Sequence, residues 1–322
     1  MPKQKFSLKN AEQVRVTTTM VQQKKIKKMY ENLYQEVTKQ ISKMGKENIK
    51  KQNLIILQRD IGNAISQMNK DIQDGIVRDM RIVSNAVVED TRTFLKQMGF
   101  KDKDIHNAFQ FVPDEIIREI ANGNVYQDNW RLSEAIWGYN KQTQYNLNRI
   151  ISIGTKQGKS AYEIALDLEQ YVEPSASKPS RRIYSWRYDK SGNKVKDSFY
   201  FGKVDYNAQR LARTLISHAY QQSFMRVNEN DPFVVGYRWI TSNFHGRVCS
   251  ICREREETNH FGLGEGVFPK DQLPLDHPNG MCTFEAVIPD SMESIADKIG
   301  MWYQAPIGTY PEIDAYALDF MS

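Results

Sequence analysis

Cysteine is scarce in this sequence, and long hydrophobic runs are absent. Only three cysteines occur among 322 residues, all between positions 249 and 282, which excludes a framework of disulfide bonds. No run of eighteen or more apolar residues predicts a transmembrane helix, and the polar, basic stretch Met1–Asn10 lacks the apolar region of a signal peptide. We therefore expect a protein without a membrane span that is assembled in the cytoplasm.

Charge is unevenly distributed along the chain. The net charge is +5, yet residues 1–51 carry thirteen Lys and Arg against four Glu, a balance of +9 that leaves −4 for the remainder. A basic segment of this kind favours an acidic partner, either nucleic acid, such as packaged double-stranded DNA, or an acidic protein surface. A solvated lysine-rich helix face is the alternative. The lysines that would contact DNA are Lys24, Lys25, Lys27 and Lys28.

The first half of the sequence has the apolar spacing of long helices. Apolar residues recur every three or four positions between 21 and 98, which is the period of one helix face. Shorter helices are predicted over 113–122, where Pro113 begins the first turn and Gly123 follows the last, and over 133–153. Three glycines are candidate breaks in the long helices: Gly45, Gly62 and Gly75.

The stretch Gly154–Ser160 is similar to a phosphate-binding loop. It has three residues between its glycines instead of four, and a helical pattern precedes it where that motif needs a strand. Ser160 and Glu163 instead form a capping box for a helix that ends before Pro174. We therefore reject an ATPase.

The second half of the chain mixes strand and helix signals. A linker composition occurs at 174–179, and alternating residues over 183–188 and 195–201 predict a β-hairpin. A helix is predicted over 204–228 and a strand over 233–241.

These signals predict an α+β fold, in which a long, mostly helical N-terminal half precedes a small mixed α+β C-terminal domain with a cysteine and histidine module. The expected order along the chain is a flexible basic arm (1–20), a helical region (21–173), the C-terminal domain (174–289) and an extended tail (290–322).

The three cysteines and one histidine have the spacing of a metal site. Cys249 and Cys252 form a C-x-x-C turn, and His277 and Cys282 follow after 24 intervening residues, beside a proline and a glycine that favour another turn. Three thiolates and one imidazole, bound at roughly 2.0–2.3 Å, are a common structural zinc environment. We predict that these four residues bind a structural Zn²⁺.

Other interpretations of these residues remain open. The C-x-x-C pair could be a redox couple, although no βαβ unit surrounds it, or the cysteines could be free thiols. A zinc deaminase is disfavoured because its H-x-E and P-C-x-x-C motifs are missing. His245 and His260 are candidate substitute ligands, and His218 is expected to be a hydrogen-bonded core residue of its helix.

Five motifs occur in a fixed order between Gly154 and Pro289. They are Gly154 to Ile164, Arg210-x-x-Arg213-Thr214, Trp239, Cys249-x-x-Cys252 and His277-Pro278-Asn279-x-x-Cys282. This order resembles the phage head morphogenesis family, which includes phage Mu protein F and related minor head proteins of tailed phages.

The sequence departs from that family at two places. The family commonly ends in H-P-x-C-R-C, whereas Gly280 stands at the first of those two cysteine positions. After C-x-x-C the family often has an acidic residue and a glycine before an aromatic, and residues 259–261 (Asn-His-Phe) occupy that place here.

The resemblance implies a minor capsid protein, present in few copies in the virion head or procapsid and assembled in the host cytoplasm. It would be associated with the portal protein, with the major capsid or scaffolding protein as further candidate partners. Its expected role is head assembly, DNA packaging or DNA delivery, without enzymatic activity.

Two alternative functions follow from the same residues. A metal-dependent nuclease would need an open metal site, for which His218, His245, His260 and Asp276 are candidates. Four ligands already complete a tetrahedral zinc site, however, and no paired acidic motif is visible. A plain DNA-binding adaptor is the other alternative, and it predicts DNA affinity without the portal.

Overall fold

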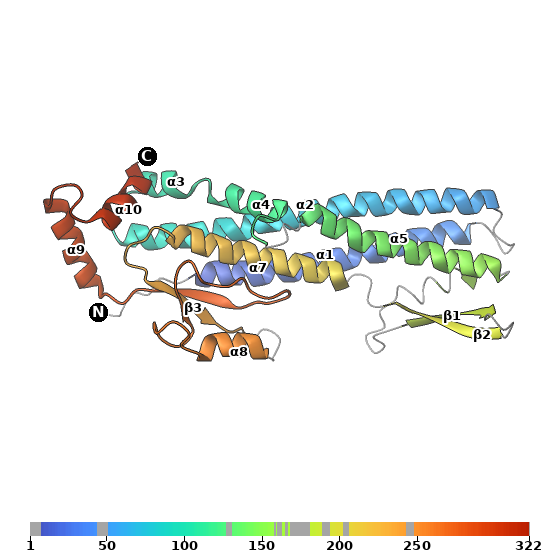
Figure 1. Cartoon of the computed structure of the whole chain (residues 1–322). Coiled ribbons are helices and arrows are strands. Elements are labelled where there is room, and N and C mark those ends of the chain that lie inside the picture. Colours follow the sequence, from blue (N-terminus) through green and yellow to red (C-terminus); the bar gives the residue numbers. More distant parts are fainter. Residues whose placement is uncertain are drawn as a thin grey trace. The chain divides into compact units, whose positions relative to one another are not determined.

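The computed structural model of the chain (Figure 1) describes residues 8–43, 51–126, 131–157, 159, 163–164, 167, 181–188, 194–201, 206–242 and 248–321. Its helices are α1 (Lys9–Ser42), α2 (Lys51–Gln97), α3 (Asp102–Phe109), α4 (Val112–Asn122), α5 (Leu132–Lys156), α7 (Tyr206–Asn228), α8 (Ser250–Glu257), α9 (Met292–Gln304) and α10 (Pro311–Met321). Its strands are β1 (Arg181–Tyr188), β2 (Lys194–Phe201), β3 (Gly236–Ile240), β4 (Val267–Phe268) and β5 (Thr283–Val287). Within these ranges, no helix is both long and apolar enough to span a membrane. The predicted α+β class is confirmed.

The chain forms two compact units that are not continuous in sequence. Unit 1 comprises Met1–Met20, Ile76–Asn129 and Arg213–Ser322, and unit 2 comprises Val21–Gly75 and Trp130–Ala212. The predicted regions, in contrast, were consecutive along the chain.

The buried positions of α1 follow an eleven-residue repeat. Leu8, Thr19, Tyr30 and Ile41 are all buried and lie eleven residues apart. Eleven residues in three turns give about 3.67 residues per turn, close to the period of a straight helix. One face of α1 can therefore stay buried along the whole length of the helix.

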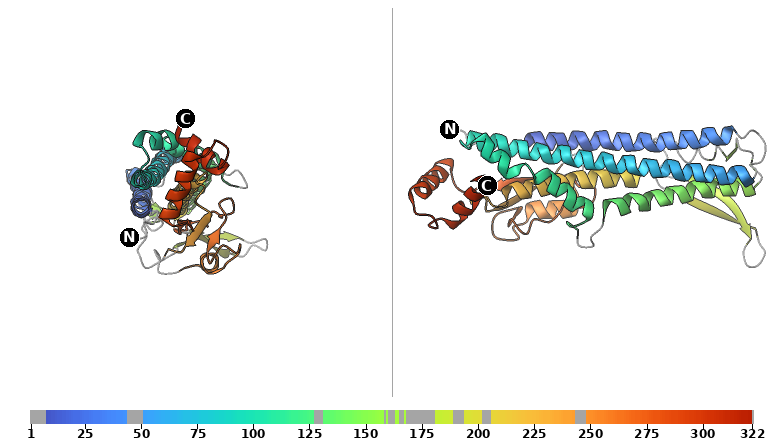
Figure 2. Two further views of the ribbon diagram at one scale, coloured as in Figure 1. Left: turned by 90° about the vertical axis from the view of Figure 1, so that its left-hand side faces the viewer. Right: turned by 90° about the horizontal axis from the view of Figure 1, so that it is seen from above.

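In unit 2, parts of α1 and α2 lie side by side with α5 (Figures 1 and 2). Gly62 and Gly75 do not break α2, contrary to the sequence expectation. A Cβ at Gly62 would lie 3.0 Å from the amide nitrogen of Gln144, and one at Gly75 would lie 2.6 Å from that of Gln22. Each glycine therefore leaves room for a glutamine side chain of a neighbouring helix. Strands β1 and β2 pair antiparallel, from Arg181 opposite Phe201 to Tyr188 opposite Lys194, which confirms the predicted hairpin strands.

In unit 1, a small sheet of order β4-β3-β5 packs on α7. All its strand pairs are antiparallel. Phe224 of α7 packs against Tyr237 and Phe284, with ring centroids 5.1 and 6.1 Å apart. Trp239, which is fully buried, contacts Phe284 edge-on at 5.2 Å. This aromatic core supports the loops at both ends of β3.

The prediction of a flexible arm over residues 1–20 is wrong where the structure describes it. Residues 9–20 belong to α1, and Ala11, Arg15 and Thr19 are buried on the face that continues through the helix. Arg15 and Thr19 hid this face in the sequence, because polar residues occupy two of these three buried positions. The remaining residues of the predicted arm, 1–7, lie outside the described residues.

The prediction of an extended tail over 290–322 is also wrong. Helices α9 and α10 form most of this segment, and Ser291 caps α9 by accepting the Ser294 N–H at 3.2 Å. Trp302 and Asp314 join the two helices through a 2.7 Å hydrogen bond.

The sequence signals for the two ends of α4 predicted that helix correctly. Helix α4 has its proline in the first turn and ends at Gly123 with φ 82°, as predicted. The predicted capping serine Ser160, the linker at 174–179 and Gly45 lie outside the described residues.

Candidate metal centre

Cys249 and Cys252 lie at the N-terminal end of α8. Cys249 is the N-cap residue, and its sulfur accepts the backbone N–H of Cys252 at 3.3 Å. An acceptor side chain at the N-cap position commonly reaches the backbone N–H of the residue two or three positions later. The C-x-x-C spacing therefore places both sulfurs on one side of the first turn, where the helix end favours negative charge.

His277 and Cys282 lie on the loop that leads into β5. Residues 277–280 form a type II turn, with Pro278 second and Asn279 third at φ 73°. The Gly280 N–H donates to the His277 carbonyl at 2.8 Å. Proline second and asparagine third are favourable residues for this turn. The sequence His-Pro-Asn-Gly thus explains the bend that turns the imidazole toward α8.

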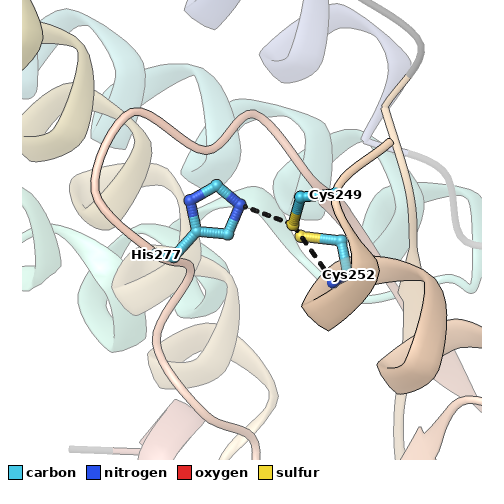
Figure 3. Close-up of side chains that lie close together, drawn as sticks. All are labelled: Cys249, Cys252 and His277. Atoms are coloured by element: carbon cyan, nitrogen blue, oxygen red, sulfur yellow. Dashed lines mark hydrogen bonds between the residues drawn. The ribbon is translucent and has the colours of Figure 1, made fainter. Parts of the chain in front are cut away.

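The structure brings the four predicted ligands together in a cluster that could bind a metal ion. Their donor atoms form two overlapping groups, each with all its donors within 4.8 Å of one another: Cys249, Cys252 and His277 (Figure 3), and Cys252, Asp276 and Cys282. The Cys249 sulfur lies 3.2 Å from the His277 Nε2, and the sulfurs of Cys252 and Cys282 are 3.4 Å apart. Donor atoms bound at roughly 2.0–2.3 Å around a tetrahedral zinc lie roughly 3.3–3.8 Å from one another. The Cys249–His277 and Cys252–Cys282 contacts are close to these separations.

Hydrogen bonding gives His277 the tautomer that a ligand needs. Its Nδ1 lies 3.1 Å from the Pro278 carbonyl, which can only accept a hydrogen bond. Nδ1 therefore carries the proton, and the lone pair of Nε2 faces Cys249. Fixing of the second ring nitrogen in this way is usual for metal-binding histidines.

The three thiols differ in their ionisation. At Cys249, burial disfavours the thiolate, but hydrogen bonds from Cys252 and the proximity of the His277 ring outweigh it and lower the pKa of the thiol. Burial, together with the hydrogen bonds to the other two cysteines, raises the pKa of Cys252 well above its usual range. Burial and then the charge of Asp276 raise the pKa of Cys282. A bound cation would reverse this preference, so metal binding should release protons.

A row of polar side chains on α7 holds the metal loop, residues 274–283. Asn279 donates its N–H to the Thr214 hydroxyl at 2.8 Å, and Ser217 donates to the Gly280 carbonyl at 3.1 Å. Gln221 donates to the Pro274 carbonyl at 2.7 Å and accepts from the Asp276 N–H at 2.9 Å. Positions 214, 217, 218 and 221 share one helix face. The loop therefore runs antiparallel to α7 along this row.

His218 belongs to the same row and is a buried, hydrogen-bonded residue, as predicted. Its Nε2 lies 2.9 Å from the Asp276 carbonyl and its Nδ1 lies 2.9 Å from the Tyr126 hydroxyl. The carbonyl requires a proton on Nε2, so Nδ1 accepts from the tyrosine. Burial lowers the pKa of His218, which agrees with a neutral ring.

Arg15 of α1 completes the support of the metal loop, and sequence reasoning missed it. Its side chain is 1% exposed. It donates to the carbonyls of Cys282 at 2.7 Å and Met281 at 3.0 Å. Its guanidinium also lies 4.4 Å from the centre of the Tyr220 ring. In the sequence, Arg15 is marked only as a single arginine on the face of α1 that is buried along the helix.

The other candidate residues lie elsewhere. His260 pairs with Glu254 at 3.0 Å and contacts the ring of Phe268, and His245 lies outside the described residues. Among the residues that the structure describes, neither potential metal-binding group contains His218 or His260. The four lysines proposed for DNA contact are exposed on α1.

Steric crowding explains the glycine at position 280. A Cβ on Gly280 would lie 2.2 Å from the carboxylate of Asp276, which is closer than atoms approach. In the phage head morphogenesis family, which this sequence resembles, a cysteine commonly stands at this position. The Asp276 side chain occupies the space that such a residue would need.

Comparison of the sequence with protein-family models finds no match, and comparisons with curated proteins and with solved structures find none either.

Proposed function

We propose that the four-residue cluster holds one structural Zn²⁺ that fastens α8 to the metal loop. The observation that carries this proposal is the convergence of three sulfurs and one correctly oriented imidazole nitrogen from two segments of chain. Four protein ligands would close a tetrahedral zinc ion to substrate, which is the arrangement of structural sites. The ion would supply folding free energy and cross-link the two segments.

The metal content of the purified protein tests this proposal. We expect about one zinc per chain by elemental analysis, and loss of that zinc in Cys282→Ser. A matched control is Ser250→Ala, which removes an exposed hydroxyl between the two α8 cysteines and should keep the metal. Absence of metal from the wild-type protein would refute the zinc site.

We further propose that the protein is a non-enzymatic minor head protein of a tailed bacteriophage, bound near the portal and acting in head assembly, DNA packaging or DNA delivery. The five ordered motifs support this proposal, and the closed donor set agrees with a structural role. Co-expression with the portal protein of the same phage, followed by size-exclusion chromatography, tests it. Co-elution is expected, and separate elution would argue against portal association.

A nuclease would need an open coordination position, so it makes a different prediction. The metal-loaded protein should not cleave DNA in the presence of magnesium, manganese or zinc if the zinc is structural. Cleavage that disappears in Cys282→Ser would favour the nuclease.

The exposed lysines of α1 are the candidate contact with packaged DNA. Lys27 and Lys28 each lie 3.8 Å from Glu31, and exposed pairs of this kind contribute little, so all four charges remain available. Changing Lys24, Lys25, Lys27 and Lys28 to glutamine should weaken DNA binding and reduce the salt dependence of log K by up to about four. The control is Lys101→Gln with Lys103→Gln, two exposed lysines of another segment.

A further inference from the structure

Every polar group of Asp276, a residue of the metal loop, takes part in a hydrogen bond. Its backbone N–H donates to Gln221 at 2.9 Å, and its carbonyl accepts from His218 at 2.9 Å. The residue is 4% exposed, so water competes little for these bonds. Helix α7 thereby fixes the backbone of Asp276 on both sides of its side chain.

The side chain of Asp276 holds the backbone of two metal-ligand residues. Oδ1 accepts the N–H of His277 at 2.8 Å, and Oδ2 accepts the N–H of Cys282 at 3.0 Å. These residues lie five positions apart, on opposite sides of the type II turn. One carboxylate therefore sets the separation of the two ends of the turn.

Gly280 provides the space in which the carboxylate sits. A Cβ there would approach the carboxyl carbon and both oxygens to 2.2 Å. Any other residue at position 280 would have to displace the carboxylate from the place where it accepts the two N–H bonds. The aspartate and the glycine act as a pair.

We propose that Asp276, accommodated by Gly280, is the positioning residue of the metal centre, which holds the backbone of His277 and Cys282 so that their side chains face Cys249 and Cys252. The inference rests on the proposed zinc site. It adds that hydrogen bonds to the Asp276 carboxylate shape the metal loop, so that the donor atoms are in place before an ion binds.

Direct coordination by Asp276 is the competing role. Its carboxylate lies within 4.8 Å of the sulfurs of Cys252 and Cys282. Both of its oxygens already accept bonds from backbone N–H groups, at 2.8 and 3.0 Å, which give the carboxylate a role that needs no ion. The sulfurs and the imidazole supply four donors without it, so coordination would add a fifth ligand to a tetrahedral ion.

Competition for zinc with a coloured chelator measures the proposed role. Asp276→Ala should weaken zinc binding by about 10- to 100-fold, the usual effect of removing a group that orients a metal ligand. Asp276→Asn keeps one accepting oxygen and should show an intermediate loss. Circular dichroism at the assay temperature establishes that each variant is folded.

A double-mutant cycle tests the pairing with Gly280. Gly280→Ala should weaken zinc binding about as much as Asp276→Ala, because the methyl group displaces the carboxylate. In the Asp276→Ala background, Gly280→Ala should cause little further loss. Independent, multiplicative losses in the double variant would overturn the pairing.

Ser217→Ala is the control for general loosening of the loop. It removes the 3.1 Å bond to the Gly280 carbonyl without touching the N–H of a ligand residue, so its effect on zinc affinity should be much smaller than that of Asp276→Ala. Equal losses would show that Asp276 acts only through loop stability.

The absorption spectrum of the Co²⁺-substituted protein separates positioning from coordination. Asp276→Asn should keep the spectrum of a four-coordinate site, whereas a changed coordination number would identify Asp276 as a ligand. A wild-type protein that binds no zinc would refute the proposed function itself. Tight wild-type binding with unaffected Asp276 and Gly280 variants would refute this inference alone.

Discussion

The helical part of unit 2 and the metal loop of unit 1 both bury their contacts, but with opposite chemistry. In unit 2, the buried face of α1 and α2 is mainly aliphatic and aromatic, with residues such as Ile26, Tyr30 and Ile72 almost fully buried. Around the metal loop, Thr214, Ser217, His218, Gln221 and Arg15 bind backbone groups of the loop.

The comparison shows what each kind of contact can do. Burial of a large apolar side chain contributes about 1.5–3 kcal/mol. Because apolar contacts are not directional, they stabilise a pair of helices without fixing the exact positions of individual atoms. A buried hydrogen bond contributes a net of about 0.5–1.5 kcal/mol, but an unpaired partner is costly. Directional bonds therefore suit a loop whose donor atoms must converge on one ion.

The largest expected effect comes from removing the metal. Cys249→Ser, or treatment with a chelator, should unfold the metal loop and α8 while the helices of unit 2 stay folded. Zinc binding contributes on the order of 10 kcal/mol to the folding of zinc-finger peptides. Hydrogen exchange should show lost protection over residues 250–257 and 274–283. Unchanged protection and an unchanged melting temperature would contradict a stabilising metal.

Truncation of a buried aliphatic residue in unit 2 should have the next largest effect. Ile72→Ala should lower the free energy of unfolding by about 2–5 kcal/mol because it leaves a cavity. Ile55→Ala removes the same atoms from the same helix at a position that is 58% exposed, and it should change stability by less than about 0.5 kcal/mol. Urea denaturation measures both, and zinc content should not change in either. Equal effects would mean that the buried face of α2, which contains Ile72, contributes no more to stability than the exposed face.

The sequence predicted the apolar features of the fold and missed the polar ones. The stripe from Ile26 to Ile41 has the helical period in apolar residues, so the helix was predicted there. The first turns of the same helix use Arg15, Thr19 and Gln22 at the equivalent buried positions. Polar residues at such positions look like an exposed arm until their partners are known.

The ligand set was predictable for a different reason. Cysteine and histidine at turn-like spacings restrict the chemistry, so Cys249, Cys252, His277 and Cys282 could be named without a fold. Asp276 was named only as a candidate of an open metal site, and Arg15 was not named, because the backbone partners of both are far away in sequence or created by a turn. Their roles depend on which carbonyl and N–H groups the fold leaves unpaired.

Removal of the arginine that supports the metal loop should have an intermediate effect. Arg15→Met keeps the length of the side chain but leaves the buried carbonyls of Met281 and Cys282 without this donor, and it should cost about 1–3 kcal/mol. Lys25→Met removes an exposed positive charge from the same helix and should change stability by less than about 0.5 kcal/mol. Chemical denaturation of both variants, loaded with zinc, measures the difference. Equal stability of the two variants would mean that the guanidinium does not support the loop.

Protonation of His218 should have the smallest effect. Because burial lowers the pKa of His218 in the folded protein, the unfolded chain binds this proton more readily. The contribution of the neutral ring is therefore complete above about pH 6.5, the ordinary value for histidine. It is lost as the pH falls from there toward the lower folded pKa, with a slope of at most about 1.4 kcal/mol per pH unit.

Denaturation of the zinc-loaded protein at a series of pH values measures this slope. His218→Gln can still donate to the Asp276 carbonyl but cannot titrate, so it should be less sensitive to pH than the wild type between pH 7 and 5. Protonation of the metal ligands affects both proteins, and it cancels in their difference. A wild-type curve parallel to that of His218→Gln would show that His218 does not titrate differently in the folded and unfolded chains. The polar row of α7 would then support the loop without making it sensitive to acid.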